Sequence, residues 1–122
     1  MIRGVRGATT VKHNNAEEMV DTTKELIAEM INKNNVRPED VAQVLISVTE
    51  DLDATFPAKA LRLITGWAYV PVMCMREIPV PNSLAKCIRI MMTVETSLAQ
   101  DQVQHVYLHG AEVLRPDLKN KG

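Results

Sequence analysis

Five charged residues interrupt or border stretches of the sequence that are otherwise apolar: Arg6, Arg62, Glu77, Arg89 and Arg115. A charged side chain is almost never fully buried unless something pairs with it, because removing an unpaired ion from water costs several kcal/mol. Arg89 shows this best, since segment 87–94 has the pattern of a buried strand apart from the guanidinium in its middle. The pattern predicts a site in which these cations pair with an anionic ligand.

Two pairs of charged residues, Glu77 with Arg89 and Lys59 with Arg62, also have explanations that need no ligand. A mutual ion pair also explains Glu77 and Arg89, and it is the less favoured explanation because buried pairs of this kind add little net stability. Lys59 and Arg62 lie three positions apart on a predicted helix and so share a face. A solvated basic surface explains that pair at least as well as a ligand clamp does.

Other chemistries are weakly supported. Cys74 is a possible nucleophile, but no base lies in its own predicted element, so a small buried apolar role is favoured. His105 and His109 have the spacing of half a zinc motif, without the intervening Glu of that motif and without a third ligand nearby. The glycine patterns of phosphate and dinucleotide binding are also missing from the sequence. We therefore expect no metal and no cofactor.

Composition narrows the classes of protein further. The chain has 122 residues and a net charge of −1, from 14 Lys plus Arg against 15 Asp plus Glu, so no overall field attracts nucleic acid or a membrane surface. No apolar run approaches the roughly 20 residues that span a bilayer, and the N-terminus lacks the apolar core of a signal peptide. We expect a cytoplasmic protein whose two cysteines are thiols. A chain of this size encloses little polar space, so a pocket with several arginines is easier to build between subunits.

The elements that position these residues follow from periodicity. Asn15 and Glu18 have the spacing of a capping box, and apolar residues follow with a 3.6-residue period to Ile31, which predicts an amphipathic helix. Pro57 and Gly66 bracket a second predicted helix over 58–65. Strands are predicted over 2–10, 44–48, 67–75, 87–94 and 103–108. This order predicts a single α+β domain over residues 1–122, with one mixed sheet of about five strands, both helices on one face, and a loose tail at 119–122.

The same residues resemble the trimeric, mixed-sheet class of bacterial chorismate mutase, which is distinct from the all-helical class. The resemblance runs nearly end to end, through these segments and residues: 2–10, 56–60, 62, 66–67, 69–72, 74–75, 77, 87–89, 91–94, 100–102, 105–108 and 113–118. It implies an isomerase that converts chorismate to prephenate by a Claisen rearrangement, at the entry to phenylalanine and tyrosine synthesis. It also implies a homotrimeric pseudo-barrel with an active site at each subunit interface, and chorismate as the small-molecule partner.

The resemblance implies substrate-binding roles for Arg6, Phe56, Ala58, Lys59, Arg62, Met73, Cys74, Glu77, Arg89, Tyr107, Leu114 and Arg115. Arg89, Glu77 and Arg6 are the implied catalytic residues. Arg89 would donate to the ether oxygen, Arg6 and Tyr107 would hold the side-chain carboxylate, and Glu77 with Cys74 beside it would accept the ring hydroxyl. The resemblance also implies a rim near the ring, formed by Phe56, Ala58, Lys59, Arg62, Leu114 and Arg115. Within this rim, Arg62 and Arg115 would screen the exposed ring carboxylate. The sequence departs from the family pattern at Met73, where a Thr is expected, and at Asn82-Ser83, in place of a glycine-rich turn.

Two other functions stay open. Small trimeric imine and enamine deaminases resemble this architecture and also place an arginine and a glutamate in an interface cleft, although the segment from Cys74 to Glu77 matches them poorly. A non-catalytic sensor of an aromatic-pathway carboxylate would need the same buried cations.

Overall fold

A mixed five-stranded sheet forms the centre of residues 1–114, which are the residues that the computed structural model describes. The strands are β1 (Ile2–Thr10), β2 (Val41–Val48), β3 (Val72–Arg76), β4 (Cys87–Glu95) and β5 (Val106–Tyr107), in the order β3-β2-β4-β1-β5. β4 runs antiparallel to β1 and β2, whereas β1 with β5 and β2 with β3 are parallel pairs. The predicted α+β class is confirmed, and the predictions for Arg115 and the tail at 119–122 fall outside the described residues.

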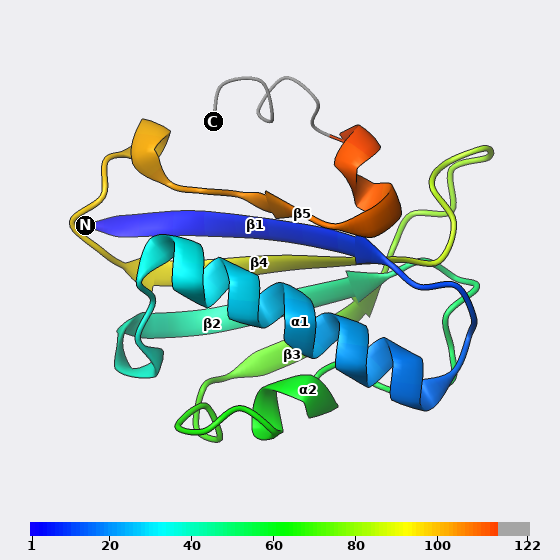
Figure 1. Cartoon of the computed structure of the whole chain (residues 1–122), viewed down its shortest axis with the longest axis horizontal. Coiled ribbons are helices and arrows are strands. Elements are labelled where there is room, and N and C mark those ends of the chain that lie inside the picture. Colours follow the sequence, from blue (N-terminus) through cyan, green and yellow to red (C-terminus); the bar gives the residue numbers. More distant parts are fainter. Residues whose placement is uncertain (115–122) are drawn as a thin grey trace.

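Helix α1 (Ala16–Asn34) lies across one face of the sheet (Figure 1). Asn15 caps its first turn by accepting the Glu18 N–H at 2.9 Å, and Asn35 ends it with a left-handed φ of 50°. The buried face of α1 carries Met19, Leu26, Ile27 and Met30, as the 3.6-residue period predicts. The Glu18 carboxylate accepts the backbone N–H groups of Lys12 and His13, so it ties down the loop before the helix and does not complete the capping box.

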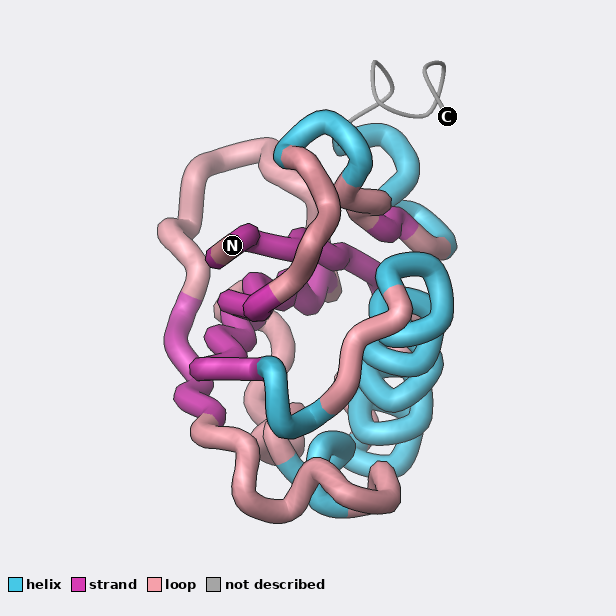
Figure 2. Tube along the Cα trace, turned by 90° about the vertical axis from the view of Figure 1, so that its left-hand side faces the viewer, coloured by secondary structure: helices cyan, strands magenta, loops and turns pink. Residues whose placement is uncertain are grey.

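The hydrophobic core fills the space between α1 and the sheet. Alternate strand residues point into it: Val5, Val44, Ile46, Ile88, Ile90, Met92 and Val94. Gly7 lets the helix approach closely, because a Cβ there would collide with the Met30 sulfur. In the rotated view α1 again lies on one side of the strands (Figure 2). The whole fold is therefore a helix packed on one face of a sheet.

The opposite face of the sheet is open in the single chain. Leu45 is half-buried there, while Met73, Met75 and Met91 are 63%, 40% and 37% exposed. The apolar run 44–48 predicts a central strand, and β2 does lie between β3 and β4, but only one of its faces is covered. The strand alternation places Ser47 on the open side with Leu45.

Three predicted elements are longer than the structure shows. The second helix, α2 (Lys59–Arg62), is a single turn, and the chain then follows turns to Gly66, whose φ is 88°. β3 begins only after Pro71, because proline cannot donate to the sheet. β5 has two residues, because the Gln104 backbone before it bonds to the Asn34 side chain and the 3₁₀ turn His109–Leu114 begins soon after it. α2 packs against α1, on the predicted side of the sheet.

No helix among the described residues is long and apolar enough to span a membrane.

Candidate active site

Arg89 and Glu77 form an ion pair on the open face of the sheet. The distance from Arg89 Nε to Glu77 Oε2 is 3.3 Å, and the two side chains are 37% and 25% exposed. Arg89 is therefore less buried than segment 87–94 predicts, because the alternation of β4 sends residues 88, 90, 92 and 94 into the core and Arg89 to the other side. Nε itself is buried and has no hydrogen-bond partner among residues 1–114, so the pair lacks a directed bond from this atom.

Glu77 is held in place by β2. Its backbone N–H donates to the Val48 carbonyl at 2.8 Å, which continues the pairing of β3 with β2 by one residue. The Ser47 hydroxyl donates to Glu77 Oε2 at 2.9 Å. Sequence reasoning missed Ser47. The one feature that could have pointed to a site role was that Ser47 is the polar residue within the apolar run 44–48.

The sheet register brings Arg6 and Tyr107 to the same region. Ala8 pairs with Arg89 on one side and with Tyr107 on the other, and Arg6 pairs with Met91. Paired residues point to the same face of a sheet, so these side chains share the open face with Arg89. The Tyr107 hydroxyl is buried and makes no hydrogen bond within the described part of the chain. The structure thus places four of the predicted residues, Arg6, Glu77, Arg89 and Tyr107, on one face of the sheet, and Glu77 and Arg89 form an ion pair there.

The predicted rim residues on and before α2 lie elsewhere in the single chain. Phe56, which is 71% exposed, and Ala58 precede α2, which carries Lys59 and Arg62. α2 packs on α1, and α1 covers the sheet face opposite Arg89. Leu114 ends the 3₁₀ turn that packs beside β1 and β5, and Arg115 follows the described residues. One chain therefore does not place the rim residues of the α2 region beside its own Arg89.

Met73 and Cys74 point to opposite faces of β3. Met73 pairs with Leu45 on the open face, whereas Cys74 pairs with Ile46 and packs against the core. Strand alternation thus turns the Cys74 thiol away from Glu77 and Arg89. In the single chain the thiol therefore does not lie beside Glu77, where the resemblance places Cys74. Any contact of Cys74 with a ligand on the open face would have to come from its main chain.

The second cysteine, Cys87, lies two residues before Arg89 and is 1% exposed. Burial raises the pKa of its thiol, and the nearby positive charge of Arg89 offsets only part of that effect. Cys87 is therefore a neutral thiol at pH 7, packed beside the guanidinium. It lacks the thiolate character that a nucleophile needs.

The two histidines of the half zinc motif have other partners. His109 Nε2 lies 2.8 Å from Glu25 Oε1, and His105 Nδ1 accepts the backbone N–H of Arg6 at 3.0 Å. Residues 1–114 contain no cluster of three or more His, Cys, Asp or Glu side chains arranged to hold a metal ion. His105 instead helps to fix the backbone from which Arg6 projects.

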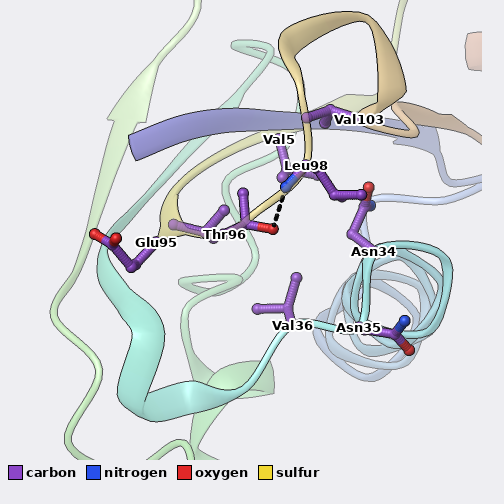
Figure 3. A pocket seen from close by; sticks show the side chains of 9 residues that line it. Val5, Asn34, Asn35, Val36, Glu95, Thr96, Leu98 and Val103 are labelled. Carbon is purple, nitrogen blue, oxygen red and sulfur yellow. Dashed lines mark hydrogen bonds between the residues drawn. The ribbon is translucent and has the colours of Figure 1, made fainter. Parts of the chain in front are cut away.

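A pocket of about 250 Å³, counted with its open mouth, lies at the C-terminal end of β4, beside Val94 and Glu95 (Figure 3). Val5, Val36, Val94, Leu98 and Val103 provide its apolar lining. Its buried polar residue, Asn34, is fully engaged, since it donates to the Met30 and Gln104 carbonyls and accepts the Gln104 N–H. This pocket is the seam where the end of α1 meets the sheet, and it contains none of the predicted site residues.

The fold and the site define a class of small α+β protein with a cluster of cations and one carboxylate on an uncovered sheet face. The family model for chorismate mutase type I matches residues 2–118, and the chain belongs to that family. The predicted resemblance is thereby confirmed.

Named relatives agree with this assignment. The chain is 57% identical over 118 residues to the chorismate mutase AroH of Bacillus subtilis (strain 168), across 97% of this chain and 93% of the relative. It is 45% identical over 121 residues to the chorismate mutase AroH of Thermus thermophilus, across 98% of each chain. A solved chorismate mutase from Clostridium thermocellum superposes with a TM-score of 0.88 at 49% identity, covering 90% of this chain and 97% of the other.

Proposed function

We propose that this protein is an isomerase that converts chorismate to prephenate, in the synthesis of phenylalanine and tyrosine. The observation that carries the proposal is the Arg89–Glu77 pair on the open sheet face, with Arg6 and Tyr107 beside it, in a chain of the chorismate mutase type I family. The half-buried thiol of Cys74 and the buried thiol of Cys87 are free, which suits the reducing cytoplasm where we place the enzyme.

The rearrangement suits a site with no nucleophile or general base. Chorismate is a dicarboxylate that rearranges within itself, with one C–O bond broken, one C–C bond formed and no proton transferred. Catalysis then depends on holding the enolpyruvyl arm over the ring and on stabilising the charge that develops. Arg6 and the unpartnered Tyr107 hydroxyl are the groups we assign to the arm's carboxylate.

Arg89 supplies the electrostatic part of the mechanism. C–O cleavage runs ahead of C–C formation, so negative charge gathers on the ether oxygen and positive charge spreads over the ring. A guanidinium directed at that oxygen binds the transition state more tightly than the ground state. Its Nε–H makes no hydrogen bond within residues 1–114, which supports this role. Glu77 accepts the ring hydroxyl, through the carboxylate oxygen that Ser47 does not use.

We further propose that the active enzyme is a homotrimer with a site at each interface. Two features support this: the open sheet face exposes Met73, Met75 and Met91, and the rim residues on and before α2 lie on the other side of the sheet from Arg89 in one chain. A neighbouring chain would cover the apolar face and bring its own Lys59 and Arg62 to the cation cluster. Arg115 would join them there.

Incubation of the purified protein with chorismate tests the activity. We expect the ultraviolet absorbance of chorismate to fall and prephenate to appear, without added metal or cofactor. Consumption of a freshly generated 2-imino acid with no effect on chorismate would favour the deaminase alternative. Tight chorismate binding without prephenate would favour the sensor. Either result overturns the proposed function.

A further inference from the structure

We infer that Ser47 is a positioning residue, which acts on the ligand through Glu77; the inference rests on the proposed function. Ser47 lies on the open face of β2 and pairs with Arg89 on β4 and with Met75 on β3. The sheet register fixes its position between these strands and the face to which its side chain points. That hydroxyl reaches Glu77, which is 30 residues away in the sequence.

The contact divides the two oxygens of the Glu77 carboxylate. Oε2 accepts the Ser47 hydroxyl at 2.9 Å and is also the atom that lies 3.3 Å from Arg89 Nε. Oε1 accepts no hydrogen bond from the residues that the structure describes. Ser47 therefore fixes one oxygen and leaves the other as the acceptor for the ligand hydroxyl.

Ser47 also shares its Glu77 oxygen with an ion pair that lacks a directed hydrogen bond from Arg89 Nε. An arginine and a carboxylate prefer directed, often paired, N–H···O bonds, in which both groups would be consumed by each other. Here Arg89 Nε lies 3.3 Å from Glu77 Oε2, yet this buried Nε–H makes no hydrogen bond with the carboxylate. The Ser47 hydroxyl donates to the same Oε2 from the β2 side, so it helps to set the orientation of the carboxylate beside Arg89.

The test is a double-mutant cycle that measures kcat/KM for chorismate. Ser47→Ala is expected to lower kcat/KM about tenfold, the scale of one hydrogen bond to a charged group. Ser47→Thr keeps a hydroxyl on the same carbon and should stay within about threefold of the unsubstituted protein. In a Glu77→Ala background, Ser47→Ala should change kcat/KM by less than about twofold, because no carboxylate remains to be oriented.

Thr93→Val is the matched control. Thr93 lies on β4 on the same open face, and its hydroxyl pairs with Gln43 at 3.4 Å and not with Glu77. Its removal should leave kcat/KM within about twofold of the unsubstituted value, on the same reasoning from lost hydrogen bonds. The thermal midpoint of each variant reports whether the fold survives. If Ser47→Ala does not fold, Ser47→Cys, with a similar volume and a much weaker donor, takes its place in the cycle.

Two results would overturn the inference: unchanged kcat/KM for Ser47→Ala, or an equal loss from Ser47→Ala with and without Glu77. Both are seen only if the unsubstituted protein turns chorismate over. Failure of the unsubstituted protein to form prephenate is a different outcome, which overturns the proposed function together with this inference.

Discussion

At the scale of residues, the position of Arg89 on the open face of β4 determines what its side chain can contact. The guanidinium lies on the open face, about one third exposed, so its removal takes nothing from the core between α1 and the sheet. Its neighbours Glu77 and Ser47 are already bonded to each other. Arg89 thus contributes little to the core, and we propose that its main role is at the ligand site.

Arg89→Ala should therefore lower turnover strongly while the protein still folds. Loss of one preorganised donor to a developing oxyanion costs on the order of 10²–10³ in rate, and a charged donor at least as much. Arg89→Lys should also cause a large loss, because one ammonium does not serve two acceptors in the fixed geometry of a guanidinium. Chorismate consumption measures the rate, and the thermal midpoint measures folding. Near-normal turnover by either variant would remove Arg89 from its proposed role.

At the scale of elements, the seam between α1 and β1 depends on one glycine. Gly7 faces α1 at Leu26 and Met30, and added atoms at its Cβ position would meet both side chains. Gly4 faces the open side, where a Cβ would meet only the flexible Met91 sulfur at 3.3 Å. The two glycines of β1 therefore differ: the close packing of α1 on the sheet requires a glycine at position 7 but not at position 4.

Gly7→Ala should destabilise the fold by about 1–3 kcal/mol, the usual range for overpacking a filled core. Gly4→Ala, its matched control, should cost much less. Urea unfolding at a fixed subunit concentration compares the two variants. Equal destabilisation by Gly7→Ala and Gly4→Ala would show that the packing of α1 against β1 does not require the glycine at position 7.

A second element-scale link joins the end of β2 to the start of β4. Asp51 accepts the Thr49 hydroxyl at 2.6 Å and the Lys86 N–H at 2.9 Å, and Thr49 Oγ1 accepts the Cys87 N–H at 2.9 Å. Slight burial by itself would raise the pKa of Asp51, but these hydrogen bonds outweigh it and hold the pKa below its ordinary value near 3.8. The loop after β2 is thereby tied to the strand that carries Arg89.

Asp51→Ala should lower the free energy of unfolding by about 1 kcal/mol at pH 7, since Asp51 is largely exposed and its hydrogen bonds are partly replaced by water. A carboxyl with a lowered folded pKa stabilises the fold above its unfolded pKa, near 3.8, and loses that contribution as pH falls through the folded value. The difference between the two proteins should therefore be constant above about pH 5 and shrink toward pH 2. Urea titrations at several pH values check this, and a difference that grows in acid would contradict it.

At the scale of the whole molecule, the uncovered sheet face is the main unfinished feature of the single chain. α1 covers one face, and the other combines exposed methionines with the charged cluster. An apolar face bordered by polar groups is typical of an interaction surface. The separation of the α2 residues Lys59 and Arg62 from Arg89 also indicates an interaction surface, because a second chain would bring its own α2 residues to the Arg89 of the first.

Light scattering after size exclusion should give a mass about three times that of one chain, as the proposed trimer requires. Leu45→Lys places a charge at the centre of the open face, between Met73 and Met91 in the register, and should shift the protein toward monomers and lower activity per chain. Ala28→Lys, on the exposed side of α1, is the control and should change neither. A monomer with full activity would contradict the proposed interface site.

The sequence by itself determined the features that neighbouring residues encode. The 3.6-residue period and the Asn15 cap predicted α1, the strand patterns predicted a mixed sheet in an α+β fold, and the isolated charges marked Arg6, Glu77 and Arg89. Helix periodicity and charge contrast are local properties, so they can be recognised in one chain without knowing its folded contacts.

Only the tertiary structure decided which side chains meet. Strand register turned Arg89 to the open face and the Cys74 thiol to the core, and it brought Ser47 to Glu77 and the His105 ring to the Arg6 backbone. It also left α2 on the far side of the sheet from Arg89. These relations join residues far apart in the sequence, and they depend on pairing and packing among several strands at once, which no local pattern encodes.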